Sequence, residues 1–296
     1  MNLLSALAWL FWNPPREAFT IPYFDIAVAW YGILFATGFV VGYFILIPIL
    51  RTMFTETTKI YPRDGINVNT LATSFADKIT WFIVIGTIVG ARLGHVLFYD
   101  WPYYSANPIE ILMIRKGGLA SHGGTLGIML ALILFLRWNR KIFPEMTFVK
   151  LIDILVIPTA MTVCFIRLAN FFNQEILGNP TNQPWGIIFG HAADGSAPIP
   201  RHPVQLYEAL AYLATFIVLY LLWKVKGTSL KPGILSGLFF IFVFGSRFFI
   251  EYLKEPQSVI DSAGLHMGQY LSIPFILMGI GLLFMPERKS PPVMLN

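Results

Sequence analysis

A histidine between glycines is one place in this 296-residue sequence where chemistry could occur. His122 follows the run from Gly117 to Ser121 and precedes Gly123 and Gly124. Because histidine titrates near neutrality, it can serve as a base, an acid or a hydrogen-bond donor to phosphate. The glycines let backbone or a ligand come close. The alternative is helix packing through small residues, with the histidine as an interhelical hydrogen-bonding group.

A second candidate is the polar run from Arg167 to Glu175. At helical spacing Arg167 and Asn170 share a face, and Asn173 follows about one turn later. Arginine presents forked donors to phosphate oxygens, and the amides and carboxylate of this run suit a polyol. The run therefore predicts a binding site for a phosphate-and-polyol head group. The alternative is a polar network that ties the following loop to the helices.

Two later runs also place charge in apolar sequence. His202 comes just before a helix that is expected to start near Pro203, and Glu208 lies inside that helix and needs a partner. We interpret both as substrate-binding candidates, with capping and helix-to-helix bonding as an equal alternative. Arg247 and Glu251 have the i, i+4 spacing that allows direct pairing. They form either a self-neutralising structural pair or a catalytic pair in which Arg247 reaches a lipid phosphate.

Charge inside a membrane costs about 2.5–3.5 kcal/mol per group on insertion scales, so each such residue needs a reason. Arg92 and Asp153 are predicted to balance one another, which is a structural role. Tyr31 lies near the outer end of the first predicted helix and could line the same cavity as the charged residues.

The composition places the chain in the membrane class. Hydrophobic residues make up 56% of it and charged residues 12%, whereas a soluble domain carries about 25% charged residues. The net charge of +5 falls mainly in loops, so membrane orientation explains it better than nucleic-acid binding does. Cys164 is the single cysteine, which excludes an intrachain disulfide and a cysteine metal cluster. We expect no metal, no organic cofactor and no cleavable signal peptide.

Apolar runs predict an all-α membrane protein with about seven spans, each near about 20 residues. The segment 3–12 is too short to span and predicts an interfacial helix. We expect one integral membrane domain over 1–296, with an outer interfacial segment at 1–26 and an arm or head at 167–203. The predicted helices are 27–50, 79–99, 119–138, 148–166, 204–223, 233–252 and 268–285.

Loop charge predicts the orientation. The loops after the first, third and fifth helices, with the C-terminus, hold 13 basic residues, and the opposite side holds 6. The positive-inside rule puts the first set in the cytoplasm, so the N-terminus is outside. The candidate residues then lie near the outer ends of their helices. We expect one cation-rich cavity that opens to the outer leaflet and suits an anionic lipid.

Together these motifs resemble the bacterial prolipoprotein diacylglyceryl transferase family over nearly the whole chain. The family pattern G-R-x-x-N-F-x-N-x-E matches Arg167 to Glu175, H-G-G matches His122 to Gly124, and R-H-P-x-Q-L-Y-E matches Arg201 to Glu208. A late R-x-x-x-E matches Arg247 and Glu251. Two positions depart from the pattern, because Ile166 and Gln174 stand where glycine is common.

The resemblance implies a transferase of the bacterial inner membrane. Its lipid substrate would be phosphatidylglycerol, and its protein substrate the lipobox cysteine of a prolipoprotein. The products would be a thioether to diacylglycerol and glycerol phosphate. The resemblance and the chemistry together suggest that Arg167 and Asn170 hold the phosphoglycerol, that Arg247 adds charge at the phosphate and that His122 is the base or a donor to the leaving group. Glu251 and Glu175 would orient the cations.

Three other functions could explain some of these features. A lipid transporter explains a cationic cavity but gives His122 no task and requires a path from the cytoplasm. An intramembrane protease requires a Ser–His pair, paired aspartates or a zinc motif, and Ser121 and His122 are helix neighbours that point apart. A structural scaffold has no use for so many buried charges.

Overall fold

The computed structural model describes residues 9–60, 67–114, 117–144, 146–255 and 264–286. Six of its helices are long and apolar enough to cross a membrane, and an additional apolar helix is shorter. The all-α polytopic prediction is therefore confirmed. The six are α1 (Trp30–Ile60), α2 (Val68–Phe98), α4 (Ser121–Asn139), α5 (Phe148–Phe172), α6 (Val204–Lys226) and α7 (Ile234–Ile250), and the shorter one is α8 (Met267–Leu283).

Several boundaries differ from the prediction, and α1 ends at Ile60 and not near residue 50. α2 begins at Val68, well before residue 79, because Asn67 caps it by accepting a hydrogen bond from the Asn69 amide at 2.8 Å. α5 continues to Phe172, so Arg167 belongs to the helix and not to the arm. α1 begins at Trp30 because the residues before it form a strand.

The predicted interfacial helix at 3–12 is wrong where the structure describes it. Leu10–Trp12 forms strand β1, which pairs in parallel with β4 (Ile187–Phe189), and residues 3–8 lie outside the described residues. The Trp12 indole donates to the Phe171 carbonyl at 3.1 Å and stacks on the Phe171 ring at 4.6 Å. Strand pairing gives the backbone of this segment hydrogen-bond partners, and the indole contact holds it in place, whereas an isolated helix this short is only marginally stable in water.

The chain divides into two compact units, which we describe separately. Unit 1 contains Met1–Leu46 and Asp153–Glu287, and unit 2 contains Ile47–Ile152 and Arg288–Asn296.

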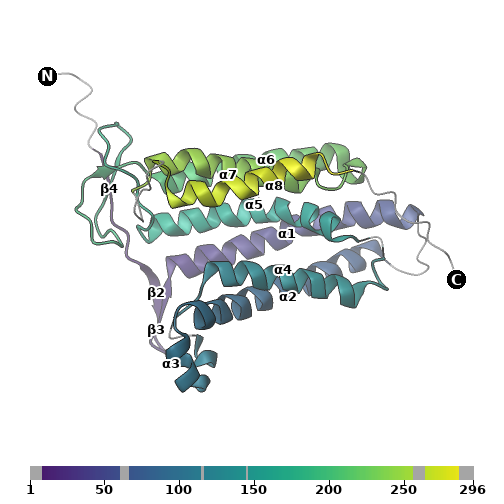
Figure 1. The fold of residues 1–296 in the computed structure, drawn as a ribbon, viewed down its shortest axis with the longest axis horizontal. Helices are drawn as coiled ribbons and strands as arrows, with labels where there is room; N and C mark the ends of the chain where they lie inside the picture. The colour runs from purple at the N-terminus through teal and green to yellow at the C-terminus, as the bar shows by residue number, and fades with distance from the viewer. Residues whose placement is uncertain (1–8, 61–66, 115–116, 145, 256–263, 287–296) are drawn as a thin grey trace. The chain divides into compact units, whose positions relative to one another are not determined.

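In unit 1, α6, α7 and α8 run side by side (Figure 1). Small residues allow close approach, as at Gly237 of α7, where an added side chain would meet the Gly279 carbonyl of α8 at 2.8 Å. The Asp153 carboxylate accepts hydrogen bonds from the Gly233 amide at 2.7 Å and the Ser236 amide at 2.8 Å, at the start of α7. The amides of a helix N-terminus thus satisfy this buried acid, and not Arg92 as predicted.

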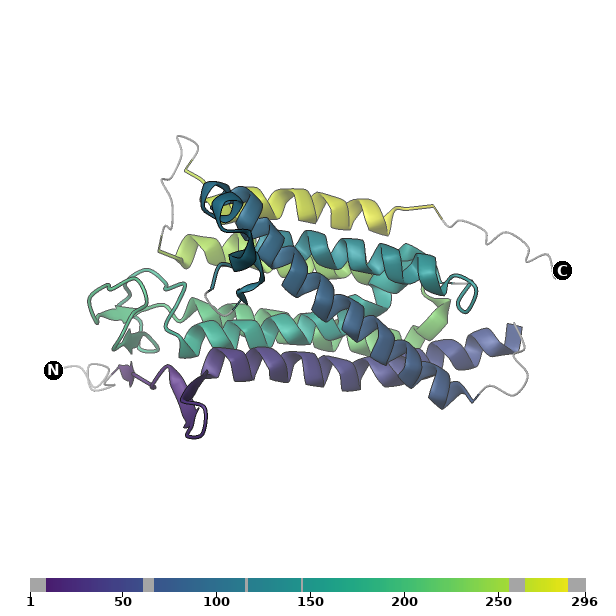
Figure 2. The same ribbon diagram turned by 90° about the horizontal axis from the view of Figure 1, so that it is seen from below.

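The arm of unit 1 follows Phe172. It contains β4 and β5 (Pro200–Arg201), which pair antiparallel, and its apolar core is formed by Phe171, Leu177, Ile187 and Phe189. Figure 2 shows the arm and the first strands of the chain at the same end of α1 and α5. The hairpin of β2 (Glu17–Ile21) and β3 (Ile26–Ala29) leads directly into α1.

In unit 2, α2 packs closely on α4. An added side chain at Gly90 would meet the Gly123 carbonyl, and one at Gly94 would meet the Gly123 Cα at 2.6 Å. Short α3 (Trp101–Ala106) and the 3-10 helix η2 (Pro108–Leu112) connect the two long helices. The aromatic residues Phe75 and Phe135 make an edge contact at 4.9 Å within the core.

Candidate active site

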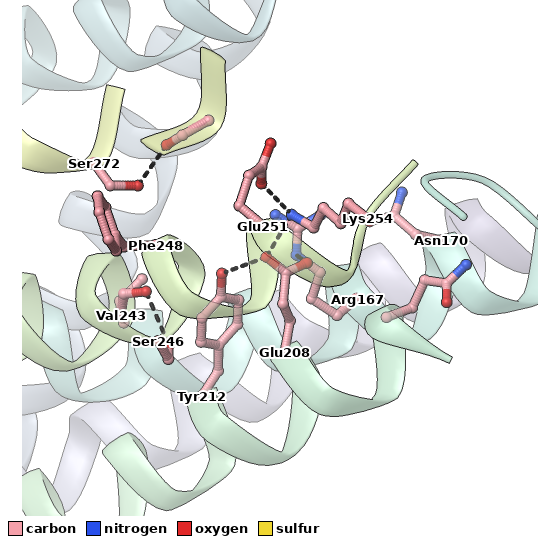
Figure 3. Close-up of polar contacts among 12 residues, drawn as sticks. Arg167, Asn170, Glu208, Tyr212, Val243, Ser246, Phe248, Glu251, Lys254 and Ser272 are labelled. Atoms are coloured by element: carbon pink, nitrogen blue, oxygen red, sulfur yellow. Dashed lines mark hydrogen bonds and ion pairs between the residues drawn. The ribbon is translucent and has the colours of Figure 1, made fainter. Parts of the chain in front are cut away.

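A fully buried carboxylate, Glu208 on α6, lies at the centre of the polar residues of unit 1 (Figure 3). Its Oε2 lies 3.0 Å from Arg167 Nε of α5, and its Oε1 accepts a hydrogen bond from Lys254 Nζ at 2.9 Å. The Tyr212 hydroxyl, one turn further along α6, donates to Oε1 at 3.4 Å. Glu208 thus holds two cationic side chains in place, and their hydrogen-bond donors suit an anionic substrate.

Arg167 also begins a chain of amide contacts. Its Nη1 donates to Asn170 Oδ1 at 3.1 Å, and Asn170 Nδ2 donates to Glu175 Oε2 at 3.0 Å. Asn173 Nδ2 donates to the other Glu175 oxygen, also at 3.0 Å. The structure thus brings together the four predicted residues of this run. Glu175 orients Arg167 through Asn170 and not by direct contact, because the two amides already occupy its carboxylate.

The residue between Asn173 and Glu175 shows why glycine is common there. Gln174 has φ 53°, in the left-handed region that favours glycine. Its buried side chain accepts a hydrogen bond from the His191 amide at 2.7 Å, and its carbonyl accepts one from the Ala193 amide at 3.0 Å. These bonds offset the backbone strain and fasten the arm to the end of α5.

Of the two alternatives for Arg247 and Glu251, the structure does not show the self-neutralising pair among the described residues. Glu251 follows α7 and is the first residue of the tighter 3-10 helix η5 (Glu251–Leu253). This turn places Lys254 Nζ 3.0 Å from Glu251 Oε2. Within the described residues, Arg247 Nε is buried and has no hydrogen-bond partner. Arg247 is therefore a cation with donor capacity to spare.

The Glu251 carboxylate lies against the first turn of α8. An added side chain at Gly268 would collide with all three carboxylate atoms of Glu251, so only glycine leaves room for it. The amide-rich start of a helix favours a negative charge in this position.

Lys254 is the main residue that sequence reasoning missed. It stands just after a predicted span, where a lysine normally marks only the membrane boundary. The structure buries it to 4% exposure, and Gly178 of the arm pairs with it in a β-bridge. The Asn179 amide donates to the Leu253 carbonyl at 2.8 Å and strengthens this link. The available signal was the i, i+3 spacing from Glu251.

Gln205 was also missed as a positioning group. Its amide donates to the Glu175 backbone carbonyl at 2.7 Å and is fully buried. Gln205 is three residues before Glu208, so the same face of α6 carries Glu208 and the side chain that hydrogen-bonds the arm at Glu175.

Two predicted residues lie beside this network. The His202 ring is 3.2 Å from the Tyr207 hydroxyl, which accepts a hydrogen bond from the Trp185 indole at 2.8 Å. Tyr31, in the first turn of α1, stacks on Phe35 and lies within electrostatic range of Arg167. His202 thus belongs to an aromatic cluster, whereas Tyr31 faces the charged residues.

His122 lies in unit 2, as the second residue of α4. Its exposed ring contacts the rings of Phe98 and Tyr99 at the end of α2, each at 5.6 Å between centroids. Its ring nitrogens make no hydrogen bond within the described part of the chain, so they are available to a substrate.

A hollow of about 620 Å³ borders the arm but does not suit a phosphate. Three carboxylates line it, from Glu175, Asp194 and Glu255. Partial burial raises the pKa of Asp194, but the hydrogen bonds from the Ser196 amide and side chain and the charge of Arg201 together outweigh this effect and hold the pKa below its ordinary value. The hollow is therefore negatively charged at neutral pH, and the cations around Glu208 are the better phosphate site. Among the described residues, no group of three or more His, Cys, Asp or Glu side chains could hold a metal ion.

Comparison with known proteins shows the family of the chain. A family model described as prolipoprotein diacylglyceryl transferase matches residues 16–285. A phosphatidylglycerol–prolipoprotein diacylglyceryl transferase of Tolumonas auensis is 46% identical, over 95% of this chain and 99% of its own. Proteins of the same name from Protochlamydia amoebophila (42% identical, 95% and 96% covered) and Porphyromonas gingivalis (39%, 93% and 94%) are also similar. With most of its length matched, the chain belongs to the prolipoprotein diacylglyceryl transferase family.

Proposed function

We infer that this protein transfers the diacylglyceryl group of phosphatidylglycerol to the lipobox cysteine of prolipoproteins, the first step of lipoprotein maturation. The observation that carries this inference is the arrangement of Arg167 and Lys254 around Glu208 and Glu251 in the same unit as Arg247, whose buried Nε has no hydrogen-bond partner among the described residues. A phosphate ester that becomes a leaving group needs cations and donors already in place. The names of the relatives specify the same two substrates.

In this reaction a carbon–sulfur bond replaces a carbon–oxygen bond of the lipid. The thiolate sulfur attacks the glycerol carbon of the diacylglyceryl group, and the bond from that carbon to the phosphate oxygen breaks. The electron pair leaves with glycerol phosphate, and the thiol proton goes to a base. Since a free cysteine has a pKa of about 8.5, the protein must favour the thiolate through a base or a positive field.

Each site residue has a proposed task in this reaction. Arg167 and Asn170 bind the phosphoglycerol, with Asn173 and Glu175 holding the amides in place. Arg247 donates hydrogen bonds to the phosphate as negative charge develops on it, because its Nε has no partner among the described residues of the protein. Glu208 and Glu251 fix the cations, and His122 takes the thiol proton or donates to the leaving group. Tyr31 and His202 line the lipid and peptide approaches.

We place the site in the bacterial inner membrane, open to the periplasmic leaflet. The support is the excess of basic residues in the loops assigned to the cytoplasm; within unit 1, the arm leads into the start of α6, whereas Lys224 and Lys226 lie in its last turn. Prolipoprotein lipoboxes would reach the site from that side.

A lipidation assay tests the function. Purified protein in vesicles of phosphatidylglycerol receives a lipobox peptide, and the mass of the peptide is followed. We expect a gain of one diacylglyceryl group with the cysteine peptide and none with a peptide in which serine replaces the cysteine. Folded protein that binds the lipid and leaves the peptide unchanged would support a lipid transporter instead.

A further inference from the structure

Arg92 on α2 is a buried cation for which the reaction above has no task. Only 3% of it is exposed. Its Nε donates to the Ile111 carbonyl at 2.8 Å, and its Nη2 donates to the Glu110 carbonyl at 2.5 Å. Its Nη1 donates to the carbonyls of Gly117 at 2.6 Å and Gly118 at 3.1 Å. All its hydrogen bonds in the described part of the chain thus go to backbone carbonyls of one connecting segment.

This arrangement fits a device that holds the backbone in one shape. A guanidinium is a rigid planar fork, so carbonyls bonded to all three of its nitrogens have fixed relative positions. The face of the Tyr104 ring, 4.8 Å from Arg92 Cζ, adds a further favourable contact for the buried charge. A lysine, with one nitrogen, cannot reach the same spread of carbonyls.

The held backbone is a turn of two left-handed glycines. Gly117 has φ 87° and Gly118 has φ 77°, so their carbonyls can turn towards Arg92. An added side chain at Gly118 would lie 2.7 Å from His95 Nε2 and 2.8 Å from Arg92 Nη1. Both positions therefore favour glycine through their backbone conformation, and at Gly118 the neighbouring side chains of His95 and Arg92 also leave no room for a side chain.

The turn ends where the helix of His122 begins. The Ala120 amide donates to the Ala91 carbonyl at 2.9 Å, one residue before α4 starts at Ser121. Adjacent residues of α2, Ala91 and Arg92, thus hold both ends of the segment 117–120. This segment fixes where the first turn of α4, and with it His122, lies along α2.

We propose that Arg92 is a positioning residue for His122, which it holds in place through the Gly117–Gly118 turn. The inference rests on the proposed function, because it takes His122 as the group that moves the thiol proton or donates to the leaving phosphate. A histidine displaced by about 1 Å loses rate in the chemical step, by as much as about 100-fold. Binding of the lipid depends on the cations of unit 1 and should change little.

Arg92→Lys tests this role through the separate behaviour of kcat and KM. We expect kcat for peptide lipidation to fall about 10- to 100-fold while the apparent KM for phosphatidylglycerol stays within about two-fold of wild type. The matched control is Tyr103→Phe, which removes the 2.6 Å hydrogen bond from Tyr103 Oη to Glu110 Oε2 in the same segment. It leaves the bonds of Arg92 intact, so its kcat should equal that of wild type.

Every other outcome overturns the proposal. An unchanged kcat in Arg92→Lys would mean that the turn does not position His122, and a rise in KM equal to the fall in kcat/KM would assign Arg92 to lipid binding. Arg92→Gln is made in parallel, with melting followed by tryptophan fluorescence. Failure of both variants to fold would assign Arg92 to stability alone. A wild-type protein without transfer overturns the proposed function and this inference with it, so the wild-type control separates the two failures.

Discussion

Glu208 decides how the charges of the site are shared. It is 0% exposed and serves two cations that come from different parts of the chain, Arg167 on α5 and Lys254 after α7. A buried charge that loses its partner is strongly destabilising, whereas one with a second partner keeps most of its compensation. Loss of either cation leaves Glu208 one cationic partner, but loss of Lys254 also removes the cation that pairs with Glu251, so Arg167 and Lys254 should respond differently to substitution.

Arg167→Ala should abolish most activity and leave the protein folded. Glu208 keeps Lys254 and Tyr212 as partners, but the forked donor for the phosphate is lost, and one such donor is worth about 100- to 1,000-fold in rate. Arg167→Lys, which keeps the charge without the fork, should recover part of the loss. The check is the rate of peptide lipidation beside the yield of folded protein. Full activity in Arg167→Ala would contradict the role given to this residue.

Lys254→Met should instead lower stability. Both Glu208 and Glu251 lose a cation, and the cost of breaking a buried pair is about 3–5 kcal/mol. Lys254→Arg keeps the charge and serves as the matched control. Thermal unfolding in detergent measures the difference, and a melting temperature for Lys254→Met equal to that of wild type would show that the network carries little stability.

Among the elements, the arm depends on a strained residue at the end of α5. Gln174 has φ 53°, and its side chain and carbonyl bond His191 and Ala193 of the arm. The strain and the hydrogen bonds act in opposite directions, so the choice of substitution separates them.

Gln174→Ala should destabilise the protein more than Gln174→Gly, by about 1 kcal/mol. Both variants lose the side-chain bond to the His191 amide, but only glycine relieves the left-handed backbone. Hydrogen exchange at the His191 amide should be faster in both variants. Equal stability of the two variants would show that the backbone of Gln174 is not strained in solution.

At this scale the sequence predicts the helices better than it predicts strand pairing or ion pairs. Hydrophobic runs are enough to place all seven helices, because each must satisfy its own backbone in a membrane. The pairing of Leu10–Trp12 with the arm depends on contacts distant in sequence and is not visible in a short apolar run. Helical spacing would allow Glu251 to pair with Arg247. The chain changes to a 3-10 helix at Glu251, and its ion-pair partner is therefore Lys254. Residue types indicate candidate site residues, and the local backbone determines which of them pair.

For the whole molecule, the loop charges predict that the arm lies on the outer side of the membrane and that the C-terminal end of α6 lies on the cytoplasmic side. Ala197 of the arm and Lys226 at the end of α6 are both exposed, which makes them suitable reporters. The single cysteine, Cys164, is buried and can be replaced by alanine to leave an unlabelled background.

Ala197→Cys and Lys226→Cys, each in that background, should react oppositely with a membrane-impermeant maleimide. The first should be labelled in intact cells or spheroplasts, and the second only after the membrane is opened. Labelling of Lys226→Cys in intact cells would reverse the orientation and place the cationic site on the cytoplasmic side.

The central claim is that the cations around Glu208 and the unused donors of Arg247 stabilise a phosphate that leaves from carbon. The most direct measurement uses phosphatidylglycerol with ¹⁸O in the oxygen that bridges the diacylglyceryl carbon and phosphorus, with mass analysis of both products. Attack at carbon predicts the label wholly in the released glycerol phosphate and none in the lipidated peptide, with Arg247→Ala slowing both products equally. Label in released diacylglycerol, which attack at phosphorus would give, or undiminished transfer by Arg247→Ala, would contradict the account.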